Sequence, residues 1–235
     1  MRGVEAAVAA GRVEMTSRPL AEYRLCLGLR DGELLRGPVL DCSGGASSFA
    51  AEARALGADV TSADPVYSLS PERLAALTAT ARERLIALAE RVGDTLDFSW
   101  SGSWEAHLKL WDGSAEAFLR DYTADRERNT GLYVAGGLPR LPFPDGRFGL
   151  TLCSFLVFTF PGLLDPFEAL RDLVRVTAPG GEVRVTPLQD AAGDPYPELE
   201  TLRVRLAETG VETEVRPIAY SLNPRQTTML VLRRG

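Results

Sequence analysis

The stretch Val39-Leu40-Asp41-Cys42-Ser43-Gly44-Gly45-Ala46-Ser47-Ser48-Phe49 decides how the chain folds. Two apolar residues lead into an acid, and a loop of small residues follows. Apolar residues then return at helical spacing, at Phe49, Ala53 and Leu56. This order predicts a short strand that ends at Asp41, a Gly/Ser-rich turn and a helix, which is the opening unit of a parallel α/β sheet.

The same alternation of strand and helix patterns continues along the chain. Further strands are expected at 60–64, 132–135, 148–155 and 182–186, and helices at 71–92, 165–177 and 194–210. The last part differs, because 211–216 alternates apolar and charged residues and a turn then leads to a final strand over 227–232. We therefore predict an α/β, doubly wound, Rossmann-like sheet of seven strands, mostly parallel, with a C-terminal antiparallel hairpin strand.

Helix boundaries follow from capping residues. Ser17 is expected to cap an N-terminal helix over about residues 16–30, and Ser70 with Pro71 begins a long helix. The segment 94–130 is longer than this connection requires and is expected to hold two short helices, after Ser103 and after Ser114. No repeat or low-complexity linker interrupts the chain, so residues 1–235 are expected to form a single domain.

Composition excludes several classes of protein. Hydrophobic residues at 45% and charged residues at 25% are typical of a globular chain. A net charge of −6 argues against nucleic-acid binding by bulk charge and leaves open only a local arginine patch for an anionic partner. Three separated cysteines and one histidine argue against disulfide frameworks and zinc sites. No metal is expected, and the alternative that these residues leave open is an all-carboxylate magnesium site. The longest apolar run, 150–164, contains Pro161 and Gly162 and is too short for a bilayer. A soluble cytoplasmic protein without membrane contact is expected.

Ligands of such sheets bind at the carboxyl ends of the strands, beside the point where strand order reverses. In the first loop, Gly45 and its small neighbours let a ligand approach the backbone closely. Asp41 would repel a pyrophosphate but would attract an amine or a sulfonium. Asp64, at the tip of the second strand, is placed to accept hydrogen bonds from a ribose diol. The alternative is that both acids merely cap turns.

Four segments in order resemble the class I S-adenosylmethionine-dependent methyltransferases, and the resemblance covers about residues 36–235. Residues 39–49 resemble motif I of that family, D-x-G-x-G-x-G, and 60–64 resemble the segment that carries its ribose-binding acid. Residues 141–148 resemble the segment L-P-F-x-D-x-x-F, and 175–181 resemble R-V-L-x-P-G-G. The resemblance implies the doubly wound fold, S-adenosylmethionine as cofactor and methyl transfer to a small-molecule acceptor.

The resemblance also assigns roles to particular residues. The methionine end of the cofactor would be held by Asp41, Ser43, Gly45 and Ser47. Asp64 would bind the ribose hydroxyls, Pro65 or Val66 would lie against the adenine, and Gly137 and Leu138 would flank it. Cys153, Ser154 and Phe155 would form the floor of the reaction centre. Because the sulfonium methyl is already activated, alignment of the acceptor would be the main task of the protein.

Departures from the family pattern keep two other functions open. Ser43 and Ser47 replace two of the motif I glycines, and 135–138 lacks the acid that often binds the adenine amine. These losses are what a catalytically silent relative that acts by binding would show. A nicotinamide or flavin oxidoreductase is the other alternative, but it would need G-x-G-x-x-G, and Asp41 would oppose the diphosphate.

The acceptor is expected to lie beneath the segment 94–130, which carries all three tryptophans. The segment is interpreted either as a lid for an apolar or aromatic acceptor or as a cap with its own aromatic core. His107 is a candidate general base because its ordinary pKa is near neutrality, and Tyr122 is a second catalytic candidate. Arg18 and Tyr23 are expected either to close over the cofactor or to form an ordinary amphipathic helix.

Overall fold

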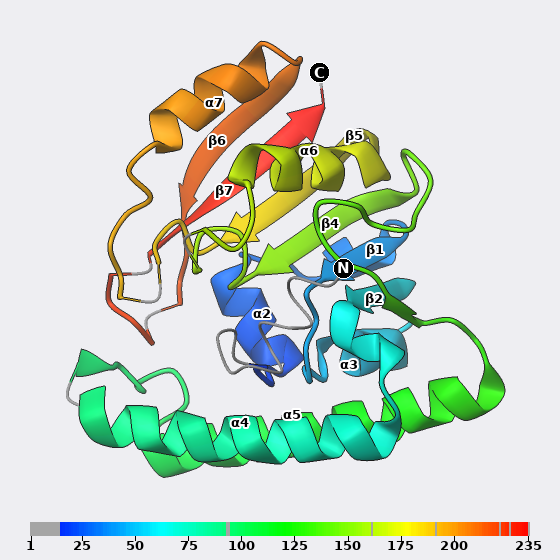
Figure 1. Ribbon diagram of the computed structural model, residues 1–235, viewed down its shortest axis with the longest axis vertical. Helices are drawn as coiled ribbons and strands as arrows, with labels where there is room; N and C mark the ends of the chain where they lie inside the picture. Colours follow the sequence, from blue (N-terminus) through cyan, green and yellow to red (C-terminus); the bar gives the residue numbers. More distant parts are fainter. Residues whose placement is uncertain are drawn as a thin grey trace.

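Seven strands form a sheet in the order β3-β2-β1-β4-β5-β7-β6 in the computed structural model of the protein (Figure 1). The structure describes residues 15–92, 95–160, 162–190, 192–220, 222–225 and 227–234. The strands are β1 (Val39–Cys42), β2 (Val60–Asp64), β3 (Tyr133–Ala135), β4 (Phe148–Ser154), β5 (Thr177–Thr186), β6 (Val211–Pro217) and β7 (Thr228–Arg234).

Strand pairing confirms the predicted topology. The strands β1 to β5 pair in parallel, whereas β7 is antiparallel to both β5 and β6. The chain runs outward from β1 to β3 and then returns to add β4 on the other side of β1. The strand order therefore reverses between β1 and β4, which is where a doubly wound sheet binds its ligands.

Helices cover both faces of the sheet (Figure 1). They are α2 (Leu20–Cys26), α3 (Phe49–Ala55), α4 (Pro71–Val92), α5 (Trp104–Arg128), α6 (Pro166–Val176) and α7 (Leu199–Ala207), with short 3-10 helices η1 (Glu33–Leu35) and η2 (Pro65–Ser68). Neighbouring strand residues explain the two layers. Val39 packs with residues of α2 and α3, while Leu40 packs with residues of α6 and α7. Successive side chains of a strand point to opposite faces, so each strand contributes to both cores.

The helices α4 and α5 lie side by side as a long hairpin below the sheet (Figure 1). Ser103 caps α5 as predicted, because its Oγ accepts from Ala106 N at 3.2 Å. The prediction of a second helix start at Ser114 is wrong, since α5 runs through this position without a break. The buried Ser114 hydroxyl instead accepts a hydrogen bond from Ser48 N at 2.9 Å, which fastens α5 to the start of α3.

Two other predicted boundaries differ from the structure. The first helix begins at Leu20, and Ser17 does not cap it, because the Ser17 hydroxyl donates to Ala46 O at 2.8 Å. The helix predicted from 194 begins only at Leu199. Prolines at 195 and 197 disfavour helical backbone in the residues that precede them, and Pro195 forms an isolated bridge with Gln189.

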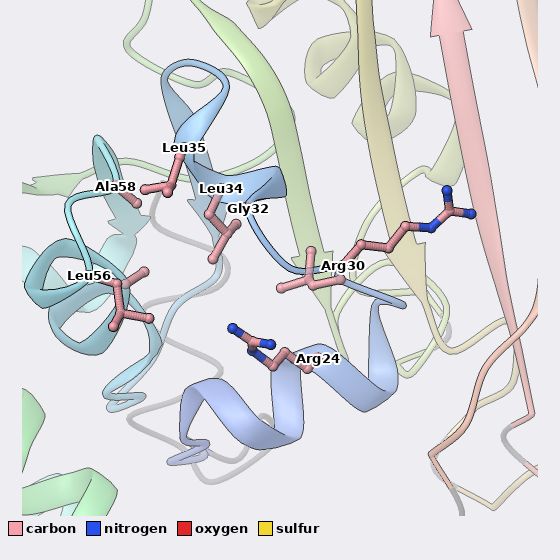
Figure 2. Close-up of a pocket in the computed structure, with 9 residues that line it drawn as sticks. Arg24, Arg30, Gly32, Leu34, Leu35, Leu56 and Ala58 are labelled. Carbon is pink, nitrogen blue, oxygen red and sulfur yellow. The ribbon is translucent and has the colours of Figure 1, made fainter.

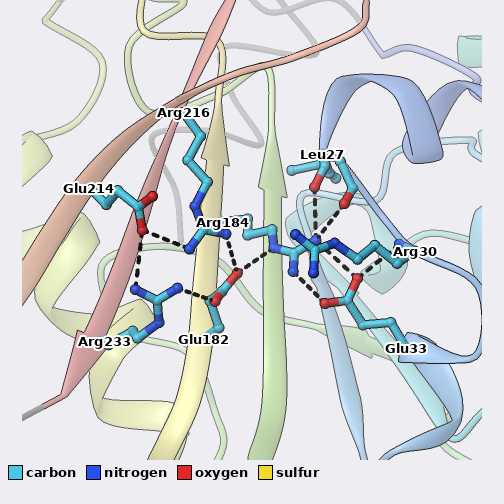
Figure 3. A network of polar contacts seen from close by, with 9 residues as sticks. Leu27, Arg30, Glu33, Glu182, Arg184, Glu214, Arg216 and Arg233 are labelled. Atoms are coloured by element: carbon cyan, nitrogen blue, oxygen red, sulfur yellow. Dashed lines mark hydrogen bonds and ion pairs between the residues drawn. The ribbon is translucent and has the colours of Figure 1, made fainter.

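A network of charged side chains joins β5, β6 and β7 to η1 (Figure 3). Arg184 is 4% exposed, and its guanidinium bonds to Glu33, to Glu182 and to the carbonyl of Leu27. Glu182 also accepts from Arg216 at 3.3 Å and from Arg233 at 2.7 Å. Burial on its own would raise the pKa of Glu182, but these arginines lower it below its usual value. The network ties the antiparallel strands to the turn that follows α2.

At the amino ends of β1 and β2 the structure contains a small cavity of about 60 Å³ (Figure 2). Its lining includes Leu34, Leu35, Leu56 and Ala58, with Arg24 and Arg30 beside them. The carboxyl ends of the same strands lie at the opposite edge of the sheet. Within the part of the chain that the structure describes, every helix is too short or too polar to cross a bilayer.

Candidate functional site

The loop between β1 and α3 contains two residues in the left-handed region. Gly45 has a φ of +55°, which glycine adopts without steric cost, and Ser43 has a φ of +65°, which costs a side-chain-bearing residue about 1 kcal/mol. Between them, a Cβ on Gly44 would lie 2.1 Å from Ser62 Oγ and 2.6 Å from Asp41 Oδ2. The loop therefore packs directly onto the polar side chains of β1 and β2.

Asp41 lies under this loop and is 1% exposed. Its Oδ1 accepts from the Tyr23 hydroxyl at 3.0 Å and its Oδ2 accepts from Ser62 Oγ at 2.9 Å. Burial raises the pKa of Asp41 to about 6, although the hydrogen bonds from Ser62 and Tyr23 lower it in part. None of the described lysines or arginines hydrogen-bonds to this carboxylate. A positively charged ligand group would therefore compensate a charge that the protein leaves poorly balanced.

Asp64 lies at the tip of β2 and binds the loop from the other side. Its Oδ2 accepts from Gly45 N at 3.1 Å, and its Oδ1 accepts from Val66 N at 3.0 Å. Burial raises the pKa of Asp64 to about 6, against the effect of these two N–H groups. Each carboxylate oxygen can accept more than one hydrogen bond, so ribose hydroxyls remain compatible with this arrangement.

Residues 15–19 cross over the loop as a strap. Ala46 N donates to Thr16 O at 3.0 Å, and Arg18 N donates to Ser47 Oγ at 3.1 Å. A Cβ on Gly45 would lie 2.9 Å from Thr16 O, so glycine is needed for this close approach. Below the strap, the Tyr23 ring stacks on Phe49 with centroids 4.2 Å apart. The strap therefore covers the loop 42–48, and Tyr23 of the helix that follows it packs on the start of α3.

The carboxyl end of β4 brings further predicted residues to the same place. Ser154 is 5% exposed and pairs with Thr186 of β5. Burial and the charge of Asp41 raise the pKa of Tyr23, while hydrogen bonding with Ser47 and Ser154 acts in the opposite direction. Asp41, Ser47 and Ser154 thus surround the hydroxyl of Tyr23.

The predicted adenine-binding residues are only partly brought together. Gly137 lies against Pro65, because a Cβ on Gly137 would be 2.7 Å from Pro65 Cγ. Leu138 is 3% exposed and its side chain packs in the core with Leu40 and Ala63. Only the backbone of Leu138 could therefore contact a ligand.

An aromatic site lies next to the predicted reaction centre, and we define it by Arg18, Trp100, His107, Phe155 and Tyr220. The Arg18 guanidinium lies 3.9 Å from the centroid of the Phe155 ring, directly after Ser154. The Phe155 and Tyr220 centroids are 6.0 Å apart, Tyr220 and Trp100 are 6.3 Å apart, and Trp100 and His107 are 5.7 Å apart. His107 is 5% exposed, and burial together with the charge of Arg18 lowers its pKa to about 4. The imidazole is therefore neutral at pH 7.

The second catalytic candidate, Tyr122, lies elsewhere. Its hydroxyl donates to Tyr67 O and Leu69 O at 2.9 and 2.7 Å, and its ring packs among Phe118, Tyr67 and Tyr133. His107 and Tyr122 are fifteen residues apart on one helix, or about 22 Å. Tyr122 supports Tyr67, whose own hydroxyl donates to Gly45 O at 2.9 Å.

Four residues of this region were missed by the sequence analysis. Ser62 donates to Asp41, and Tyr67 donates to Gly45 O in the loop. Glu22 accepts from both Arg18 and the Tyr220 hydroxyl. A polar residue inside the apolar strand β2 was an available signal for Ser62. For Tyr220 there was none, because it is 198 positions from Glu22 in the chain.

Comparison with known proteins agrees with this geometry. Residues 105–185 match the protein family described as methyltransferase domain. This match agrees with the resemblance predicted from the motifs, although the matched residues do not include the loop 42–48. The match begins inside the segment 94–130, whose role as a lid stays a prediction.

Other proteins similar to this chain are distant from it in sequence. Uncharacterized protein MJ0045 of Methanocaldococcus jannaschii is 24% identical over 190 residues, which are 77% of this chain and 80% of that protein. The solved structure concerned with conversion of a disulfide bond into a thioacetal group during echinomycin biosynthesis is 20% identical, covers 100% of this chain and 93% of its own, and has a TM-score of 0.52. This second likeness shows the fold.

A further solved structure is that of the Burkholderia thailandensis 1,6-didemethyltoxoflavin-N1-methyltransferase with bound 1,6-didemethyltoxoflavin and S-adenosylhomocysteine. It is 16% identical, covers 97% of this chain and 83% of its own, and has a TM-score of 0.47.

Proposed function

We propose that the protein transfers a methyl group from S-adenosylmethionine to a small-molecule acceptor. The observation that carries the proposal is the buried carboxylate of Asp41, which lies where the strand order reverses. Two hydroxyl groups donate hydrogen bonds to it, and none of the described lysines or arginines does. Burial raises its pKa to about 6, so most of the group is charged at pH 7. The methionine ammonium of the cofactor would supply the missing positive charge.

The residues around Asp41 suit the remaining parts of this cofactor. Ser43, Gly45 and Ser47 would line its methionine end, and Asp64 would accept from the ribose hydroxyls with its free lone pairs. Pro65 and Gly137 would lie on the adenine side, with Leu138 contributing backbone alone. When bound, S-adenosylmethionine supplies an activated methyl group at a sulfonium centre. Ser154 and Phe155 would then hold the acceptor beside it, since proximity provides much of the rate.

His107 would receive a proton from the acceptor. Its imidazole is buried, neutral at pH 7 and close enough to Arg18 for that charge to lower its pKa. Tyr122 has no part in this proposal, because its hydroxyl donates to the carbonyls of Tyr67 in η2 and of Leu69 just after it.

Calorimetry and thermal melting with S-adenosylhomocysteine, S-adenosylmethionine and NADH test the cofactor. A ligand at 100 times its dissociation constant adds about 2.7 kcal/mol to the free energy of unfolding. We expect stabilisation by both adenosyl compounds and none by NADH. No shift with millimolar S-adenosylhomocysteine would instead fit the silent relative, in which the bonds of Asp64 to Gly45 and Val66 are purely structural.

Asp64→Ala tests the ribose contact. We expect its affinity for S-adenosylhomocysteine to fall at least tenfold, because hydrogen bonds to a charged group contribute about 1.5–3 kcal/mol. Asp64→Asn keeps the shape and one acceptor oxygen and should lose less. Asp145→Ala, the same change at a carboxylate that is 73% exposed, is the matched control. Unchanged affinity in a folded Asp64→Ala protein would show that the ribose assignment is wrong.

A further inference from the structure

Two buried polar atoms of the aromatic site lack a partner. Trp100 Nε1 and His107 Nδ1 are both inaccessible to solvent, and neither hydrogen-bonds to any residue that the structure describes. A buried polar atom without a partner costs about 1–3 kcal/mol. Two such atoms within one site indicate that something outside the described chain completes their bonding.

The two atoms come from different elements that meet at this point. Trp100 lies in the turn before α5, and His107 lies in the first turn of α5. Their rings are nearly perpendicular, at 86°, with centroids 5.7 Å apart. The turn is held in place where Asp97 N donates to Leu222 O at 2.9 Å. Trp100 itself is partly exposed, which leaves a side for entry.

The chemistry of the two atoms is complementary. An indole N–H can only donate, whereas Nδ1 of a neutral imidazole accepts when the ring carries its proton on Nε2. The imidazole is neutral because burial and Arg18 lower its pKa to about 4. A hydroxyl group both accepts and donates, so a single hydroxyl oxygen would satisfy both atoms.

The surroundings favour an uncharged aromatic body for this hydroxyl. Arg18 is paired with Glu22 at 3.0 Å, so the site carries little net charge. Phe155 and Tyr220 lie on one side, and Phe98 and Trp104 pack on His107 at 5.4 and 6.3 Å on the other. Ring stacking and edge contacts of this kind suit a flat aromatic ligand.

We propose that the aromatic site binds a phenolic methyl acceptor, whose hydroxyl accepts from Trp100 Nε1 and donates to His107 Nδ1. The methyl-transfer part rests on the proposed function. The oxygen–methyl bond forms as the methyl–sulfur bond breaks, the hydroxyl proton passes to His107, and S-adenosylhomocysteine is released. Phe155 belongs to this site through Arg18 and Tyr220 and directly follows Ser154 in the chain.

Three small probes separate the hydroxyl from the ring. 4-Methylphenol can donate and accept, 4-methylanisole can only accept, and toluene can do neither. Binding is measured by tryptophan fluorescence and by saturation-transfer NMR with the wild-type protein. We expect 4-methylphenol to bind about fivefold more tightly than 4-methylanisole and about tenfold more tightly than toluene. Equal binding of all three, or no binding of 4-methylphenol, would overturn the proposal.

Variants then test each atom. Trp100→Phe keeps a ring but removes the donor, and we expect it to weaken 4-methylphenol binding about fivefold without changing toluene binding. Trp111→Phe is the matched control, because Trp111 packs in the separate core of α4 and α5. His107→Leu should lose the preference for phenol over anisole, and His107→Asn, whose amide oxygen can accept, should restore part of it.

Binding of S-adenosylhomocysteine distinguishes the two proposals. If it binds and 4-methylphenol does not, the acceptor inference fails and the methyltransferase proposal stands. If 4-methylphenol binds with the expected preference and S-adenosylhomocysteine does not, the phenol site stands as a binding site and methyl transfer fails. A crystal structure with water between Trp100 and His107 that 4-methylphenol does not displace would also overturn the inference.

Discussion

Two regions of this molecule hold carboxylates away from bulk solvent in opposite ways. At the carboxyl ends of β1 and β2, Asp41 and Asp64 are bound by hydroxyl and amide groups, and burial raises the pKa of each to about 6. On β5, Glu182 accepts from three arginines, and its pKa is lowered (Figure 3).

The difference separates stability from function. Pairing the half-buried Glu33 and Glu182 with arginines makes a structural network, in which the charges balance within the protein. The carboxylates at the sheet edge are held in position but not neutralised, which raises the free energy of the folded chain at neutral pH. Such a cost is expected where a ligand is to bring the opposite charge.

The largest effect is expected when an arginine is removed from the network around Glu182. Arg184→Met would leave Glu33 without its arginine and Glu182 with one arginine fewer. We expect the free energy of unfolding to fall by about 3 kcal/mol, measured by urea denaturation at pH 7. Arg171→Met is the control, because Arg171 and Glu168 are each 52% exposed and such a pair contributes about 0–1 kcal/mol. Equal losses would mean that the two regions do not differ as described.

The opposite result is expected at the sheet edge. Asp41→Asn removes a charge that the folded protein disfavours, so we expect it to raise the free energy of unfolding at pH 7 by about 2–3 kcal/mol. The same variant should bind S-adenosylhomocysteine more weakly. Denaturation and calorimetry on one preparation give both values, and a destabilised Asp41→Asn protein would contradict the comparison.

The pH dependence follows from the same group. The usual pKa of an aspartate is 3.8, and that of folded Asp41 is about 6. As pH rises from about 4 to 6, the unfolded chain loses this proton first, so the contribution of Asp41 to stability falls over that range. Asp41→Asn should flatten the curve of unfolding free energy against pH there, and Asp64 should account for part of the slope that remains.

The smallest effect concerns the backbone of the loop. Ser43 has a φ of +65°, and Ser43→Gly would restore the residue that the motif of the family has at this position. We expect a gain of about 0.5–1 kcal/mol in the free energy of unfolding, because left-handed backbone is unfavourable for serine. Ser68→Gly, at an exposed position of η2, should give no such gain. Absence of a difference would mean that the loop carries no strain.

Much of the fold could be predicted because its signals are local. Apolar periodicity gave the strands β1, β2 and β4, and Pro71 marked the first residue of α4. The prediction failed where a residue with a local capping pattern instead forms a hydrogen bond to a residue far away in the sequence. Ser17 has the chemistry of an N-cap, but its hydroxyl bonds to Ala46, and Ser114 bonds to Ser48 from the middle of α5.

The sequence by itself determined which acids stand at the strand ends, because strand termini and small-residue loops are fixed by neighbouring residues. Only the tertiary structure decided how those acids are bound. Tyr23 and Ser62 reach Asp41 from 18 and 21 positions away, and Tyr220 meets Glu22 across 198. The unpaired atoms of Trp100 and His107 are likewise a property of packing. Hydrogen-bond partners depend on which surfaces meet after the sheet forms, and the periodicity of the sequence does not predict these contacts.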